Sequence, residues 1–148
     1  MPELRELYQE LILEHSKHPR NYHALEGADR KVDGYNPLCG DHFTIYLKLA
    51  GDRLAEISFE GTGCAISKSS ASVMTQALKG KTTEEAEELF HRFHDLVTGK
   101  ATANVEALGK LAAFSGVSEF PVRVKCATLA WHALHEALAG TEASVTTE

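Results

Sequence analysis

The chain has 148 residues, of which 43% are hydrophobic and 24% charged, and these shares are typical of one globular domain with one core. Its formal net charge of −6 argues against nucleic acid or an anionic membrane as the main partner, because phosphate binding needs clustered lysine and arginine. No apolar stretch approaches a membrane span, and the polar N-terminus lacks the pattern of a signal peptide. We therefore expect a cytoplasmic protein, in which three reduced cysteines point to metal or sulfur chemistry.

The first half of the chain predicts one helix followed by strands. Apolar residues recur every three or four positions over 2–17, which predicts a helix. A short strand is expected near 29–34, and alternating polarity predicts strands over 42–50 and 54–60, joined by a Gly-Asp turn. In the last of these strands the alternation turns three side chains inward, namely Ala55, Ile57 and Phe59.

The second half predicts helices. The apolar period becomes helical over 64–79 and again over 84–97, where Thr83 is a candidate N-cap. A further helix is expected over 104–114, and Pro121 fits the first turn of the last helix. The fold class is therefore α+β, with a small antiparallel sheet of about three strands packed against several helices.

We expect one domain over residues 1–140. The remaining residues, 141–148, are small or polar and predict a disordered tail.

Four residues form a candidate metal site, namely Cys39, Asp41, Cys64 and Cys126. Three thiolates and one carboxylate have the number and type of ligands of a tetrahedral zinc site. Residues two apart in extended backbone project to the same side, so Cys39 and Asp41 are expected to bind one ion. A turn aspartate beside an ordinary cysteine is the alternative.

The other two cysteines each allow a second interpretation. Cys64 lies at a predicted helix N-terminus, where the helix dipole and Lys68 favour a thiolate, but it can equally be a small buried residue. Cys126 lies on the apolar face of the last helix, where free cysteine is often part of the core. Arg123 lies about 60° from Cys126 around that helix, and a guanidinium there fits a thiolate or an anionic metal cluster better than a core.

The histidines are the competing ligands. His132 lies about 240° around the last helix from Cys126, so it faces away from that thiol. His42 follows Asp41 and is expected on the opposite face of its strand. The others are interpreted as surface residues: His15, His18, His23, His91, His94 and His135.

Three motifs in this order, NPLCGD, GTGCAISKSSASVM and VKCATLAWHAL, resemble the IscU/NifU-like iron–sulfur cluster assembly family, and more closely its SufU branch. The resemblance covers roughly residues 3–140. It implies a NifU-N/SufE-like α+β fold and Cys39, Asp41, Cys64 and Cys126 as ligands. The implied cofactor is zinc, with iron or a [2Fe–2S] cluster on the three cysteines as the alternative.

Two departures from the IscU pattern favour the SufU branch. Lys125 stands where IscU proteins have a histidine before the third cysteine, and the segment FPVRVK replaces their chaperone-binding motif. The sequence therefore does not predict whether a chaperone is a partner. The helix over 84–97 is the expected insertion relative to IscU.

The resemblance implies a sulfurtransferase-type sulfur acceptor rather than a stand-alone enzyme. Its partners would be a SufS/IscS-type cysteine desulfurase and downstream iron–sulfur assembly or client proteins. We expect Cys39 to accept the sulfur and Arg123 to support the transfer. The alternatives are a scaffold that assembles and transfers a [2Fe–2S] cluster, a zinc-stabilised interaction domain without sulfur transfer, and a hydrolase with a Cys–His pair, for which no histidine has a suitable phase.

Overall fold

A computed structural model describes residues 2–100, 108–140 and 144–146. In chain order the elements are α1 (Pro2–Lys17), β1 (Arg30–Asn36), β2 (Asp41–Ala50), β3 (Arg53–Thr62), α2 (Ala65–Leu78), α3 (Thr83–Val97), the 3-10 helix η1 (Gly109–Glu119), α5 (Pro121–Leu138) and β4 (Val145–Thr146). The predicted α+β fold with an antiparallel sheet and several helices is confirmed.

The sheet contains four strands in the order β3-β2-β1-β4. Strands β1, β2 and β3 pair antiparallel in sequence order, as predicted. The short strand β4 was not predicted: Val145 pairs in parallel with Gly34 of β1, so residues 145–146 are ordered within the tail for which the sequence predicts disorder. Of the same tail, residues 141–143 and 147–148 lie outside the described residues, as does the segment 104–107 of the predicted helix over 104–114.

One prediction within the sheet is wrong. Ala55 is exposed and Leu54 is fully buried, because the pairing of β2 with β3 shifts by one residue between Lys48 and Leu49. A β-bulge of this kind changes which side chains face the core on either side of it. Ile57 and Phe59, beyond the bulge, face inward as predicted.

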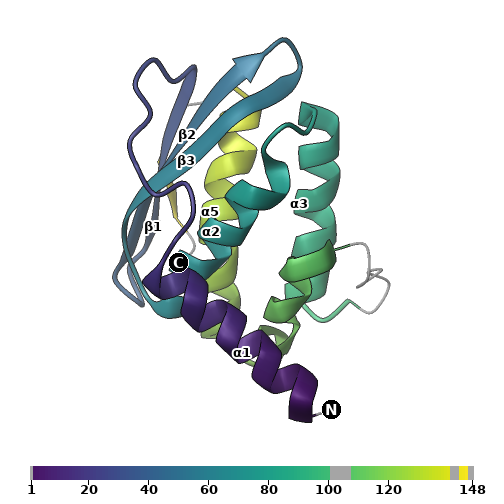
Figure 1. Ribbon diagram of the computed structural model, residues 1–148. Helices are drawn as coiled ribbons and strands as arrows, with labels where there is room; N and C mark the ends of the chain where they lie inside the picture. Colours follow the sequence, from purple (N-terminus) through teal and green to yellow (C-terminus); the bar gives the residue numbers. More distant parts are fainter. Residues whose placement is uncertain (1, 101–107, 141–143, 147–148) are drawn as a thin grey trace.

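Helices α2 and α5 cover one face of the sheet, and α3 lies on the far side of them (Figure 1). Leu129 of α5 packs beneath Gly34 of β1, where an added Cβ would lie 3.1 Å from the leucine side chain. On the other side of α5, the ring of Trp131 stacks on Phe93 of α3 with centroids 4.7 Å apart. The long buried face of α5 therefore fixes its position, and with it the position of Cys126.

Helix boundaries follow local capping chemistry. Thr82, not Thr83 as predicted, caps α3: its hydroxyl accepts a hydrogen bond from the backbone N–H of Glu85, and the Glu85 carboxylate accepts one from the backbone N–H of Thr82. Pro121 occupies the first turn of α5, as predicted. None of the described helices is both long and apolar enough to cross a membrane.

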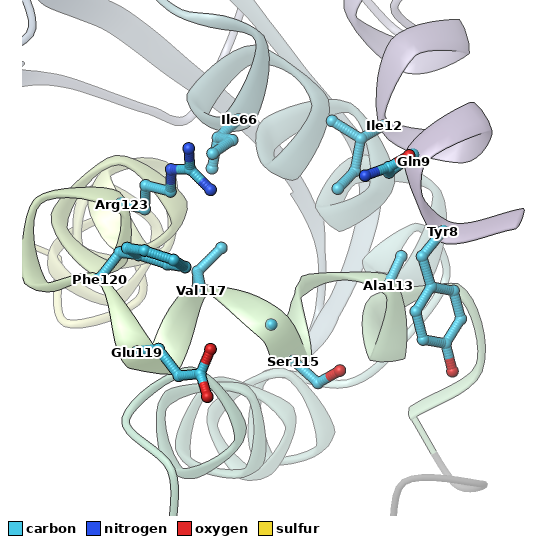
Figure 2. A pocket seen from close by; sticks show the side chains of 11 residues that line it. Tyr8, Gln9, Ile12, Ile66, Ala113, Ser115, Val117, Glu119, Phe120 and Arg123 are labelled. Carbon is cyan, nitrogen blue, oxygen red and sulfur yellow. The ribbon is translucent and has the colours of Figure 1, made fainter. Parts of the chain in front are cut away.

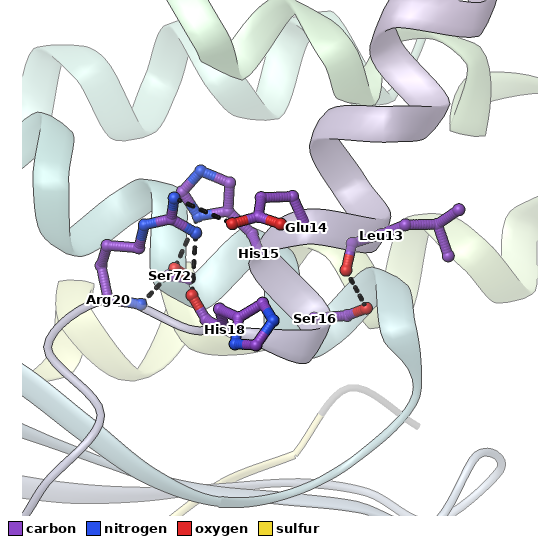
Figure 3. Close-up of polar contacts among 7 residues, drawn as sticks. All are labelled: Leu13, Glu14, His15, Ser16, His18, Arg20 and Ser72. Carbon is purple, nitrogen blue, oxygen red and sulfur yellow. Dashed lines mark hydrogen bonds and ion pairs between the residues drawn. The ribbon is translucent and has the colours of Figure 1, made fainter.

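His15 is buried, which contradicts its interpretation as a surface residue. It is 2% exposed, and its Nδ1 lies 2.7 Å from the Oγ of Ser72 on α2 (Figure 3). The same Ser72 oxygen accepts a hydrogen bond from the backbone N–H of Arg20. Burial, followed by the nearby charges of Arg20 and Lys110, lowers the pKa of His15 from 6.5 to about 4. Neutral His15 therefore shares a hydrogen bond with the Ser72 hydroxyl and joins α1 to α2.

The buried His15–Ser72 contact predicts that the stability of the fold depends on pH. Between pH 6.5 and 4 the unfolded chain protonates His15 but the folded chain does not, so the free energy of unfolding falls as the pH is lowered through this window. The shift corresponds to at most about 3 kcal/mol. We expect His15→Gln to remove this part of the pH dependence in urea unfolding at pH 7, 6, 5 and 4. His18→Gln, at an exposed position, is the control, and equal slopes in His15→Gln and wild type would contradict the prediction.

Candidate metal centre

Cys39 lies in the loop 37–40 that joins β1 to β2. Asn36 pairs with Asp41 at the end of the ladder, and the backbone N–H of Cys39 donates to the carbonyl oxygen of Asn36. Gly40 has φ +69°, a left-handed conformation that glycine adopts without strain. Cys39 and Asp41 are thus brought together by a tight turn, and not by the extended backbone that the sequence analysis assumed.

Asp41 is the first residue of β2 and is 2% exposed. Its Oδ1 accepts a hydrogen bond of 2.8 Å from the backbone N–H of Cys64, and its Oδ2 accepts one of 3.2 Å from Asn36 Nδ2. The register of β2 on β3 pairs His42 with Thr62, so the chain leaving β3 carries Cys64 directly past Asp41. The carboxylate is therefore fixed in place, with Oδ2 directed toward the sulfur atoms.

Cys64 is the N-cap of α2, which confirms its predicted place at a helix N-terminus. Its Sγ accepts from the backbone N–H of Ser67 at 3.5 Å and lies 3.9 Å from Asp41 Oδ2. Donation from the first turn of a helix favours a thiolate at this position. Lys68 lies with its Nζ 4.9 Å from the ring centre of Tyr22.

Cys126 lies on the buried face of α5 and is 2% exposed. Its Sγ is 3.1 Å from Cys39 Sγ and 3.4 Å from Asn36 Nδ2. One residue further on, the hydroxyl of Ser70 on α2 donates to the carbonyl of Ala127, which holds the two helices together beside the site. Cys126 is therefore buried like a core residue, but its sulfur atom lies against the other candidate ligands.

The four predicted ligands meet at one end of the sheet. The ligand atoms of Cys39, Asp41 and Cys126 all lie within 4.8 Å of one another. Cys64 is outside that group, with its Sγ 3.9 Å from Asp41 Oδ2. A tetrahedral zinc ion with Zn–S bonds of 2.3 Å holds two sulfur atoms about 3.8 Å apart. The sulfur atoms of Cys39 and Cys126 are 3.1 Å apart, so a zinc ion between them would need these two atoms to move slightly apart. The types of the donor atoms and their closeness therefore fit zinc.

The electrostatics of the site favour a cation. Burial raises the pKa of the Cys126 thiol well above its ordinary value, and the hydrogen bonds to Cys39 and Cys64 and the negative charges of Cys64 and Asp41 raise it further. A bound cation reverses this balance, because it stabilises the thiolates that otherwise repel one another. Metal binding is therefore coupled to release of protons from these thiols.

Comparison with known proteins places this geometry in a family. A family model described as the NifU-like N terminal domain matches residues 7–127. The chain belongs to the NifU-like N-terminal domain family. It is 46% identical over 136 residues to the zinc-dependent sulfurtransferase SufU of Bacillus subtilis (strain 168), with 92% of each chain covered. It is 40% identical over 138 residues to the iron-sulfur cluster assembly scaffold protein IscU of Streptococcus pyogenes serotype M1, covering 93% of this chain and 86% of that protein. The resemblance recognised in the sequence is thus confirmed.

Solved structures agree with the fold. The crystal structure of FiSufU from Fervidobacterium islandicum AW-1 matches with a TM-score of 0.84 and 37% identity, covering 90% of this chain and 97% of that one. The N-terminal part of a NifU-like protein from Brucella abortus matches with a TM-score of 0.82 at 22% identity, covering 90% and 93%, and this likeness concerns the fold alone.

Asn36 is a site residue of this NifU-like protein that the sequence analysis did not single out. It is fully buried, and its Nδ2 donates to both Asp41 and Cys126. Its Oδ1 has no hydrogen-bond partner among the described residues. The side chain therefore orients a carboxylate and a thiol at once. Its place at the start of NPLCGD, three residues before the first cysteine, is the signal that could have identified it.

Arg123 does not reach the cysteines. Its guanidinium lies over the ring of Phe120, 4.5 Å from the ring centre, and lines a groove between α1, η1 and the start of α5 (Figure 2). Ile66, two residues after Cys64, lines the same groove near Arg123 (Figure 2). Arg123 is thus exposed beside the metal centre rather than inside it.

The histidines of the described residues are not ligands at this centre. His42 turns away as predicted and stacks on Tyr35, with ring centroids 4.3 Å apart. The group of close metal-ligating side chains found in the described part of the chain contains Cys39, Asp41 and Cys126 but no histidine. The hydrolase alternative therefore lacks the Cys–His contact on which it depends.

Gly63 allows the close approach of α2 to Asp41 and predicts a sensitive position. An added Cβ would lie 2.6 Å from the Phe43 ring, 2.6 Å from Ser67 Oγ and 2.7 Å from Asp41 Oδ1. Gly63→Ala must therefore displace the carboxylate or the helix start. Since disturbing groups around a metal ligand typically lowers affinity about 10- to 100-fold, we expect at least a tenfold weaker zinc affinity in competition with a chromophoric chelator.

Gly116→Ala is the matched control, because nothing lies within 4 Å of an added Cβ there. We expect it to bind zinc as tightly as the wild type. A Gly63→Ala protein with unchanged zinc affinity would show that Asp41 is not held by this contact.

Proposed function

We propose that this protein works in iron–sulfur cluster assembly as a sulfur acceptor, at a zinc site formed by Cys39, Asp41, Cys64 and Cys126. The observation that carries the proposal is the unequal setting of the three thiols. Cys39 and Cys64 are both half-buried, but Cys39 lies on a turn next to Leu38, which is 63% exposed, whereas Cys64 caps a helix and Cys126 is buried on one. One thiol is thus carried by a turn while the other two are held by helices.

Zinc suits this set of ligands. When bound, it keeps cysteine thiols deprotonated at neutral pH, and the thiolate is the nucleophilic form of cysteine. Zinc is also named for the relative from Bacillus subtilis. Asp41, held by the Cys64 amide and by Asn36, supplies the one oxygen ligand.

The transfer step is an exchange at sulfur. The Cys39 thiolate attacks the outer sulfur of a cysteine persulfide on the donor protein. A new S–S bond forms at Cys39, the S–S bond of the donor breaks, and the donor cysteine leaves as a thiolate that takes up a proton. No net oxidation or reduction occurs.

The donor is expected to be a cysteine desulfurase of the SufS/IscS type, and the recipients are downstream iron–sulfur assembly or client proteins. Three large apolar side chains are exposed in the segments that carry Cys39 and Cys126, namely Leu38, Phe120 and Val122. Exposed apolar side chains of this size suit a protein partner. Arg123, beside Phe120, would support the transfer by attracting the anionic sulfur or orienting the donor. The chain therefore acts with a partner rather than as a stand-alone enzyme. Free thiols of this kind suit the reducing cytoplasm.

The proposal predicts where the sulfur arrives. Trypsin separates the three cysteines into three peptides, because a lysine or arginine lies between each pair. After a single turnover with a desulfurase and cysteine, we expect the extra sulfur on the peptide that contains Cys39. Mass spectrometry after acid quench and alkylation measures this in the wild-type protein, so the result does not depend on a variant's folding. An extra sulfur confined to the Cys64 or Cys126 peptide would contradict it.

Two variants sharpen this experiment. Cys39→Ser should receive no sulfur. Arg123→Gln should still receive it at Cys39 but roughly three- to tenfold more slowly, because charge complementarity mainly affects the rate of association. Zinc content by elemental analysis separates lost chemistry from a lost site. Transfer to Cys39→Ser at the wild-type rate would remove Cys39 as the acceptor.

A scaffold for a [2Fe–2S] cluster is the second candidate. The 40% identical relative is an iron-sulfur cluster assembly scaffold protein, and three convergent cysteines are suitable cluster ligands. Purified protein that contains iron and acid-labile sulfide would favour the scaffold, and colourless protein with one zinc favours the acceptor. A zinc-stabilised interaction domain would leave all three thiols inert toward a persulfide donor.

A further inference from the structure

Helices α3 and α5 bring four histidines together on the side of α5 away from the metal centre. His91 and His94 lie one turn apart on α3, and His132 and His135 lie one turn apart on α5. The rings approach each other edge to face in two pairs. The centroids of His91 and His135 are 6.4 Å apart, and those of His94 and His132 are 6.0 Å apart. Each helix therefore offers two imidazoles to the other.

Phe90 holds these rings in place. It is buried, and its ring stacks on His135 with centroids 4.8 Å apart at an interplanar angle of 13°. The other three imidazoles contact the same phenyl ring, at centroid distances of 5.3 Å for His91, 5.6 Å for His132 and 6.3 Å for His94. The four histidines thus form one cluster rather than separate surface residues.

Glu87 adds a carboxylate between two of the imidazoles. Its Oε1 lies 2.8 Å from His135 Nδ1, and its Oε2 lies 3.8 Å from His91 Nε2. Glu87 and His91 are one helical turn apart on α3, while His135 comes from α5. Two imidazole nitrogens from two helices therefore lie against the two oxygens of one carboxylate. The three ligand atoms are not all within 4.8 Å of one another, so His91 must rotate toward His135 to share an ion with it.

We propose that Glu87, His91 and His135 bind a divalent transition-metal ion such as Zn²⁺, with His94 and His132 as neighbouring ligands. Imidazole nitrogen and carboxylate oxygen are common zinc ligands, and two of them on a tetrahedral ion lie about 3.3 Å apart. That value falls between the two observed distances. The side chain of His91 is 68% exposed, so a small rotation can bring its Nε2 to the ion.

Glu87 and a neutral imidazole make the cluster suitable for a cation. Burial, with the nearby His94 and His135, lowers the pKa of His132, so its imidazole is neutral and available as a ligand at pH 7.

This second site is separate from the cysteine site. His132 follows Cys126 by six residues on one straight helix, which corresponds to about 9 Å along the axis and about 240° around it. The metal bound there would therefore have nitrogen and oxygen ligands alone. An ordinary ion pair between Glu87 and a protonated histidine is the competing interpretation of the same contacts.

The test is a titration of protein that already holds one equivalent of zinc. Isothermal titration calorimetry with Zn²⁺ at pH 7.5 should show a second binding event in the wild type. His91→Gln together with His135→Gln should weaken that event at least tenfold, and Glu87→Gln alone should weaken it by a smaller factor. The matched control is His18→Gln together with His23→Gln, two exposed histidines outside the cluster, which should leave it unchanged.

Cobalt distinguishes the two sites by their ligands. In metal-free protein the first equivalent of Co²⁺ should give thiolate charge-transfer absorption, and the second should add none. Circular dichroism of each variant checks that the helices persist. A wild type with no second event, a cluster variant that titrates like the wild type, or a control that loses the event would each overturn the proposal.

Discussion

The hydrogen bond from the Cys64 amide to the Asp41 carboxylate joins two segments that the site requires, both at one end of the sheet. It connects the turn after β1 with the helix that follows β3, and Asn36 extends it to Cys126 on α5. Because the carboxylate is buried, each of its oxygens needs a partner, and the available partners are the segments that carry the cysteines. This contact therefore links the turn to the start of α2, and the Asn36 side chain links both of them to α5.

The three thiols differ because of the elements that carry them. A helix packed against the sheet and the other helices positions Cys126, and a helix N-cap positions Cys64, so both resist displacement. Cys39 lies on a turn whose glycine has open space beside it. A metal site made of two rigid ligands and one on a turn can keep its ion while one sulfur reacts, which is the property that a sulfur acceptor needs.

The sequence predicted those parts of the fold that repeat a local pattern. Helical period and alternation identified α1, β2, α2, α3 and α5 close to their observed bounds, and the order of three cysteines led to the family. The bulge at Ala55 was not predictable, because a one-residue shift between two strands leaves no pattern in either strand alone.

The other features that the sequence analysis did not predict depend on tertiary contacts. His15 looks like a polar residue at a helix end until Ser72, 57 residues away, supplies its partner. The position of Asn36 in NPLCGD hinted at a role, but its contact with Cys126 depends on the placement of α5 beside β1. The four ligands were assigned by type and by resemblance, whereas the turn that brings Cys39 to Asp41 became evident from the backbone conformation of Gly40.

X-ray absorption at the zinc edge, on protein loaded with one equivalent of zinc, tests most directly that these four side chains share one ion. The account predicts three sulfur scatterers near 2.3 Å and one oxygen scatterer at about 2.0–2.2 Å. A first shell with two sulfur atoms or fewer, or with the multiple scattering of an imidazole ring, would contradict it.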